Sequence, residues 1–201
     1  TLPFTVDGQR TNTLDSTLTF AATRGSSGSA FIDYVAEDAA GHQASGEVEI
    51  VLPFRVDTLL QEGDIARYLL PADGTIDSTW MLPEFDASSW ASGNTGLGYD
   101  TRTDFLSSIE TTLTNFQGTS TSIFVRLPFT ANSSAQYTQL ALKMKIDDGF
   151  VAYLNGEEVA RSSNVIGTSP LPWNTETTQS TSDSQALTFA VFDLTENASL
   201  L

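Results

Sequence analysis

The sequence predicts an all-β fold, and three observations favour it. Several segments alternate apolar and polar residues with a period of two, the pattern of a strand with one buried face. Helix-like spacing is rare, and Ser, Thr, Gly and Asn fill the stretches between the alternating segments. The chain has 201 residues, of which 40% are apolar, so it can build the core of one large domain or two small ones.

Two strands are predicted in the first part of the chain, at residues 31–35 and 47–52. A third is predicted at residues 123–127. All three segments are rich in Val, Ile, Phe and Leu, which suit a pleated, half-buried surface.

The clearest strand signals lie in the second half of the chain. Residues 140–146 alternate Leu, Met and Ile with two lysines, which predicts a half-buried antiparallel strand. Residues 150–154 and 157–161 flank Asn155-Gly156. This dipeptide is typical of a two-residue hairpin turn, because both positions tolerate a positive φ.

Helical signal is thin in this sequence. Residues 56–70 allow a short helical turn, although Gly63 interrupts the apolar spacing. Residues 104–113 allow one or two turns beneath an Asp cap. The remaining element is a strand expected at residues 187–194.

Composition and charge exclude several functional classes. Lys and Arg total 9 and Asp and Glu total 25, a net charge of −16 that repels nucleic-acid phosphates and anionic lipid. We therefore expect no nucleic-acid partner. No apolar run approaches the ~20 residues of a membrane span, so we expect no membrane insertion either. The absence of cysteine excludes disulfides, thiol nucleophiles and Cys-zinc sites.

The sequence also argues against an enzyme. Its single histidine, His42, follows Gly41 in an apparent hairpin loop, so we expect an exposed turn residue and not a catalytic base. No spacing singles out the pair of carboxylates that a glycosidase needs. We predict that the protein has no catalytic residues.

A domain boundary is predicted at Leu52-Pro53, where strand signals give way to Trp, Gly and turn signals. This divides the chain into residues 1–52 and 53–201. The first segment is short for an independent domain, because a module below ~60 residues buries little of its surface. It is therefore an incomplete module, or it packs against the second one.

Residues 18–52 resemble the C-terminal strands of bacterial immunoglobulin-like or cadherin-like repeats. The stretch that carries the likeness runs from Phe31 through Asp33 and Tyr34 to Asp38 and Gly41, followed by the alternating strand 47–52. The resemblance implies a short N-terminal immunoglobulin-like β segment.

Two motifs in the second segment resemble galactose-binding-like jelly rolls. The first contains Trp80, Trp90 and the sequence Gly96-Leu97-Gly98-Tyr99, and the second is the predicted hairpin from Ile146 to Arg161. The likeness implies an antiparallel β-sandwich of the kind found in carbohydrate-binding modules of secreted, multimodular bacterial proteins. The hairpin is also similar to that of PA14-type adhesin domains, in which two successive aspartates hold a calcium ion that holds a sugar.

Asp147 and Asp148 are the candidate metal ligands. Carboxylate oxygens suit Ca²⁺, which takes six to eight oxygens at about 2.3–2.6 Å. The alternative is a turn cap, in which one aspartate accepts backbone N–H bonds while Gly149 takes a positive φ. Other acidic residues lie in loops where no spacing selects a metal site: Asp73, Asp77, Asp100 and Asp104.

Trp173, Asn174 and Glu176 are the candidate sugar-binding residues. Pro170 and Pro172 stiffen the polar loop before Trp173, and a flat indole beside an amide and a carboxylate suits a sugar ring. The alternative is a Trp folded onto the edge of the sandwich. The other two tryptophans, which lie among Gly and Pro residues, are expected to belong to the core.

These observations predict a noncatalytic carbohydrate-binding or surface-attachment module. Its partners would be a polysaccharide or cell-surface glycan and other domains of the same parent chain, with Ca²⁺ as a possible structural or bridging ion. The chain begins at Thr1 without Met or a signal-like segment, so we expect it to be cut from a longer precursor. We expect an extracellular or cell-surface location, because a cysteine-free, acidic chain rich in Ser and Thr is typical of bacterial extracellular modules. The alternatives are a structural spacer without a ligand and an accessory domain of a polysaccharide-degrading enzyme.

Overall fold

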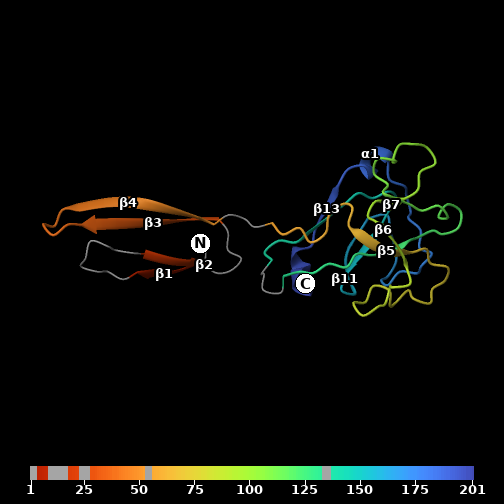
Figure 1. The fold of residues 1–201 in the computed structure, drawn as a ribbon, viewed down its shortest axis with the longest axis horizontal. Helices are drawn as coiled ribbons and strands as arrows, with labels where there is room; N and C mark the ends of the chain where they lie inside the picture. Colours follow the sequence, from red (N-terminus) through yellow and green to blue (C-terminus); the bar gives the residue numbers. More distant parts are fainter. Residues whose placement is uncertain (1–3, 9–17, 23–27, 53–55, 133–136) are drawn as a thin grey trace. The chain divides into compact units, whose positions relative to one another are not determined.

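The structure of the chain is a computed structural model with short strands joined by long loops (Figure 1). It describes five segments: residues 4–8, 18–22, 28–52, 56–132 and 137–201. Within these segments strands dominate, helices are few, and nearly all strand pairs are antiparallel. The predicted all-β class is confirmed.

Two compact units make up the chain, and each is considered by itself. The first is formed mainly by residues up to Asp57, and the second by residues from Thr58 onward. The boundary predicted from the sequence borders residues 53–55, which lie outside the described residues. The assignment of the units to an immunoglobulin-like segment and a jelly roll stays a prediction.

The first unit contains two antiparallel pairs of strands. β1 (Phe4–Gly8) pairs with β2 (Leu18–Ala22). β3 (Gly28–Glu37) pairs with β4 (Gln43–Leu52) along the full length of both strands. The two strands predicted in the first part of the chain lie inside β3 and β4 and are confirmed.

The side chain of Asp38 closes the loop between β3 and β4. Its Oδ1 accepts the backbone N–H groups of Ala40 at 2.8 Å and His42 at 2.9 Å, and its Oδ2 lies 2.8 Å from His42 Nδ1. The side-chain hydrogen bond with His42 is the main reason why the pKa of Asp38 lies below its ordinary value. The His42 side chain is 83% exposed, so the prediction of an exposed turn histidine is confirmed.

In the second unit, β5 (Ile65–Leu69) lies between β6 (Ala91–Asn94) and β9 (Phe124–Arg126) in a three-stranded antiparallel sheet. The helical turn expected here is wrong, because Ala66 is fully buried between two exposed neighbours, as in a strand. Gly63, with a φ of 87°, forms the turn that leads into β5. The strand predicted around Phe124 is confirmed as β9.

β7 (Leu97–Gly98) pairs in parallel with β8 (Thr111–Thr112). The segment 104–113, where one or two helical turns were expected, contains a single turn closed by backbone hydrogen bonds to the carbonyl of Phe105. Asp100 holds the start of this turn, because its Oδ2 accepts the Phe105 amide at 2.8 Å. The chain then adopts an extended conformation at β8.

The predicted central hairpin is confirmed as β11 (Val151–Leu154) and β12 (Glu157–Arg161). Asn155 and Gly156 connect the strands with φ values of 50° and 94°, as a two-residue turn of this type requires. The Asn155 side chain also donates to the carbonyl of Leu200 at 2.7 Å. The turn is thereby tied to the last described residues of the chain.

β10 (Ala141–Met144) pairs antiparallel with β13 (Ala190–Asp193). Exposed and half-buried residues alternate along β10, as predicted. The strand expected from residue 187 begins later, because the short helix α1 (Asp183–Ala186) and a turn precede it. The 3₁₀ helix η1 (Thr195–Leu200) follows β13.

The buried apolar residues of the second unit come from both strands and loops. They are Ala66, Met81, Trp90, Leu113, Phe124, Val165, Ala186 and Leu194. Trp90 is 7% exposed, which confirms the prediction for this residue. Trp80 is half-buried and stacks on Phe124 with ring centroids 4.5 Å apart, while Tyr153 meets its ring edge-on at 5.6 Å.

Candidate binding site

The backbone of Trp173 is fixed from two sides by residues distant in sequence. Its N–H donates to Asp77 Oδ2 at 3.1 Å. Its carbonyl accepts a hydrogen bond from the hydroxyl of Ser122. Both contacts involve loop residues outside the regular strands, so three loops of the second unit meet at Trp173.

The indole of Trp173 is half-buried and leaves part of its surface accessible. One edge lies over Gly74, where an added Cβ would come within 3.3 Å of Trp173 Cδ1 and 2.9 Å of Asp77 Oδ2. Glycine at this position therefore permits the close approach of the two loops. The other carboxylate oxygen, Asp77 Oδ1, is buried and has no hydrogen-bond partner among the described residues.

Asn174 and Glu176 are exposed beside Trp173. A tight turn presents them, because the N–H and hydroxyl of Thr175 donate to the carbonyl of Pro172 at 3.0 and 2.7 Å. The loop thus combines a partly accessible aromatic surface with an amide and a carboxylate that face solvent.

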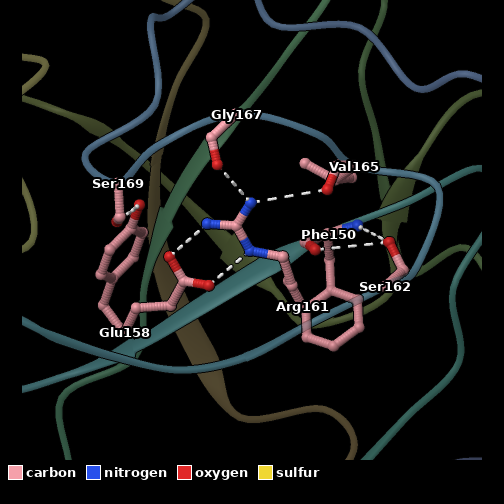
Figure 2. A network of polar contacts seen from close by, with 8 residues as sticks. Phe150, Glu158, Arg161, Ser162, Val165, Gly167 and Ser169 are labelled. Carbon is pink, nitrogen blue, oxygen red and sulfur yellow. Dashed lines mark hydrogen bonds and ion pairs between the residues drawn. The ribbon is translucent and has the colours of Figure 1, made fainter.

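The residues before this loop form a polar network around Arg161, shown in Figure 2. The guanidinium binds both carboxylate oxygens of Glu158, with Nη2 2.6 Å from Oε2. Nη1 donates to the carbonyl of Gly167 at 2.9 Å. Bidentate pairing of this kind is both strong and geometrically specific. The hydrogen bond to Gly167 fastens the loop that leaves β12 back onto the hairpin.

Arg161 stabilises the ionised form of Glu158 within this network. The hydrogen bond from Arg161 is the main cause that lowers the pKa of Glu158, and Ser169 adds a smaller effect. Ser169 also lies 2.8 Å from the hydroxyl of Tyr153 on β11. The loop is therefore fixed from β11 and β12 up to the residue before Pro170.

The predicted metal ligands occupy a turn between β10 and β11. Asp147 and Asp148 are exposed, and the positive φ of the turn, 63°, is at Asp148. This corrects the expectation for Gly149, whose role is steric. A Cβ there would lie 2.6 Å from Thr177 Cγ2 and 2.9 Å from Val165 Cγ2. Glycine is needed because the loops pack closely.

Although Asp147 is exposed as a residue, partial burial of its carboxyl group raises its pKa, and repulsion from Asp148 and Asp183 raises the pKa further. A hydrogen bond from the Asp148 amide acts in the opposite direction, as a turn cap would. The ionised form of Asp147 is therefore held at a cost that a nearby cation would reduce.

Asn164 and Thr181 fasten this turn to the long loop after β12. Asn164 Nδ2 donates to the carbonyls of Asp148 and Gln179, both at 2.7 Å. The hydroxyl of Thr181 donates to the same Asp148 carbonyl at 3.0 Å. Asn164 Oδ1 is buried and has no hydrogen-bond partner within the described residues.

The donor chemistry of Asp147 and Asp148 fits Ca²⁺, which binds carboxylate and carbonyl oxygens. Over the described part of the chain, however, no group of three or more His, Asp or Glu residues is gathered closely enough to hold a metal ion. Backbone carbonyls and water would have to supply the remaining ligands of an ion held by these two residues.

The predicted sugar and metal residues are held by different partners. Trp173 is fixed by Asp77 and Ser122, whereas the Asp148 carbonyl is fixed by Asn164 and Thr181. No local pattern in the sequence indicates these partners, because each lies at least 16 residues from its target. Sugar binding at Trp173 and calcium binding at Asp147 and Asp148 are therefore two separate hypotheses.

Two of the other loop acids considered for a metal, Asp73 and Asp100, have structural roles. Asp73 Oδ1 accepts the Thr75 amide at 2.9 Å, and Asp100 Oδ1 accepts the Arg102 amide at 2.7 Å. These bonds close Asx turns, a common role of aspartate in loops. The pKa of Asp73 is lowered mainly by its hydrogen bond with the Thr75 side chain.

No known protein family, curated protein or solved structure matches this chain. Among the described residues, no helix is long and apolar enough to cross a membrane. The site must therefore be interpreted from its own geometry.

Proposed function

We propose that the second unit is a noncatalytic carbohydrate-binding module with a galactose-binding-like jelly-roll fold. The observation that carries the proposal is Trp173, a partly accessible indole with a fixed backbone and exposed polar neighbours at Asn174 and Glu176. The ligand class is a polysaccharide or cell-surface glycan. The parent protein would be secreted or displayed at a cell surface, and the first unit would be an immunoglobulin-like segment of it.

The physical argument rests on preorganisation. A sugar ring presents an apolar face of C–H groups and a rim of hydroxyls. The indole of Trp173 would take the apolar face, and the amide of Asn174 and carboxylate of Glu176 would bind hydroxyls. Because hydrogen bonds with Asp77 and Ser122 already hold the loop, little ordering cost remains for binding.

Calcium is the cofactor that we propose for the Asp147–Asp148 turn. The support is the raised pKa of Asp147, caused first by burial and then by repulsion from Asp148 and Asp183. A bound Ca²⁺ would neutralise this repulsion and stiffen the turn. It would act as a structural ion, since the turn and Trp173 have different partners.

A glycan array tests the proposal, with wild-type protein and two variants measured side by side in millimolar Ca²⁺. Trp173→Ala removes the stacking surface, and Phe189→Ala is the matched control because Phe189 is an aromatic residue outside the Trp173 loop that is 42% exposed. We expect the wild type and Phe189→Ala to bind the same glycans and Trp173→Ala to lose them. Absence of binding by the wild type across the array would favour a structural spacer.

A further inference from the structure

The outward-facing side of the β3–β4 hairpin combines apolar and acidic residues. Directly opposite residues of an antiparallel pair share a face. The register therefore places one set of side chains together, and every member is exposed. This outer hairpin face consists of Ser29, Phe31, Asp33, Val35, Glu37, Gln43, Ser45, Glu47, Glu49 and Val51.

Three large apolar side chains are prominent on the outer hairpin face. Phe31 is 60% exposed, Val35 is 65% exposed and Val51 is 61% exposed. On the opposite face of the hairpin, Ile32 and Ile50 are half-buried and Val48 is 45% exposed. Phe31 and Val51 are diagonal neighbours, because Val51 lies opposite Ser29, and Val35 lies beyond Asp33 on the same face. Exposed apolar groups that share one face are typical of an interaction surface, whereas single ones are not.

The charges on the same face are all negative. Asp33 lies directly opposite Glu47, and Phe31 lies opposite Glu49. Like charges directly opposite each other destabilise a strand pair. The hairpin segment, residues 28–52, contains no Lys or Arg that could offset this repulsion. Glu37, at the loop end, has a neutral partner, because Gln43 donates to it at 2.8 Å.

We propose that the outer hairpin face docks a second protein whose surface carries Lys or Arg side chains next to apolar ones. Cationic groups would lie against Asp33, Glu47 and Glu49, and apolar groups would cover the exposed Phe and Val side chains. A second copy of this chain is a poorer fit, because its net charge of −16 adds repulsion. A cation alone would leave the apolar side chains in water. The inference does not depend on the proposed carbohydrate binding.

The test uses the whole chain and a short synthetic peptide of alternating valine and lysine as the probe. A peptide of alternating serine and lysine has the same charge without the apolar groups. Binding is measured by fluorescence anisotropy at about 0.15 M salt, where the screening length of ~8 Å suppresses attraction from distant charges. We expect the valine peptide to bind at least tenfold more tightly than the serine peptide.

Two triple variants locate the binding. The face variant carries Asp33→Asn, Glu47→Gln and Glu49→Gln. The matched variant removes three exposed carboxylates from the second unit instead, by Asp104→Asn, Glu157→Gln and Glu196→Gln. Both change the net charge equally. The face variant removes a repulsive pair, so its hairpin is not expected to unfold.

We expect the face variant to lose at least tenfold in affinity for the valine peptide and the matched variant to lose less than twofold. Phe31→Ser, which keeps every charge, should lose about fivefold. Equal losses in both triple variants would show attraction by overall charge and overturn the proposal. So would equal binding of the two peptides, failure of the valine peptide to bind, or a dimer of the protein alone in sedimentation that the face variant abolishes.

Discussion

Replacing Gly149 with alanine tests how closely the loops pack around the Asp147–Asp148 turn. A Cβ at this position would lie 2.6 Å from Thr177 Cγ2, 2.8 Å from Ser162 Oγ and 2.9 Å from Val165 Cγ2. Favourable contacts between carbon atoms are about 3.5–4.0 Å long. The loops around the turn must therefore move to accept a single methyl group.

Two of these neighbours have little freedom to move. Ser162 Oγ accepts the Phe150 amide at 2.9 Å, and Val165 is 8% exposed. Overpacking a well-filled site costs about 1–3 kcal/mol. With three short contacts we expect a loss of about 2 kcal/mol in the free energy of unfolding for Gly149→Ala. For a chain of this size that lowers Tm by about 4–8 °C.

Urea unfolding followed by tryptophan fluorescence measures the effect. Gly98→Ala is the control, because its added Cβ would lie 3.5 Å from the nearest atom, on Ile109. We expect it to cost less than about 0.5 kcal/mol. Thr177→Ser removes the methyl group of the shortest contact, so the double variant should recover about half of the loss. An unchanged midpoint for Gly149→Ala would refute the reasoning, as would a loss that Thr177→Ser leaves unrelieved.

Three further predictions concern the metal, the polar network and the core. Millimolar Ca²⁺ should raise Tm relative to EDTA, and Asp147→Asn should abolish this rise. Without metal, Asp147→Asn should stabilise the protein at pH 7 and have no effect at pH 2. The reason is that the pKa of Asp147 is raised in the folded state. The free energy of unfolding therefore falls as pH rises above about 4. Arg161→Ala should cost about 2 kcal/mol at pH 7 and less below pH 4, because the lowered pKa of Glu158 contributes stability only while Glu158 is ionised. Trp90→Ala should lower the free energy of unfolding in urea by about 3–5 kcal/mol, since the buried Trp90 ring packs against Phe85 with ring centroids 5.4 Å apart. Equal Tm values in Ca²⁺ and in EDTA would contradict the calcium prediction. A cost of Arg161→Ala that does not change with pH would contradict the prediction for the network, and an unchanged free energy of unfolding for Trp90→Ala would contradict the prediction for the core.

The sequence predicted those elements whose signals are local. The hairpin at Asn155-Gly156 follows from two residues that tolerate positive φ, and β10 follows from strict alternation. β5 was missed because its apolar spacing also fits a helix, and only the burial of Ala66 decides between the two. β6, at Ala91–Asn94, has no β-branched or aromatic residue, so nothing in its composition indicates a strand.

The candidate site was predictable only in part. The prolines before Trp173 indicate a stiff loop. The hydrogen-bond partners of Trp173, Asp77 and Ser122, lie 96 and 51 residues away along the chain. Contacts at that distance depend on how the loops fold together, which no local pattern encodes. The same holds for Gly149, where a turn glycine suggested a positive φ and the structure shows a steric reason instead.

Carbohydrate binding at Trp173 is the central claim, and isothermal titration calorimetry tests it most directly. The titrant is the oligosaccharide that the array identifies, measured against wild type, Trp173→Ala and Phe189→Ala. Stacking on an indole is worth ~1.5–3 kcal/mol, so Trp173→Ala should raise Kd at least tenfold while Phe189→Ala leaves it unchanged. The urea midpoint of Trp173→Ala should stay close to that of the wild type, because the contacts with Asp77 and Ser122 involve its backbone. An unchanged Kd in a folded Trp173→Ala protein would contradict the account.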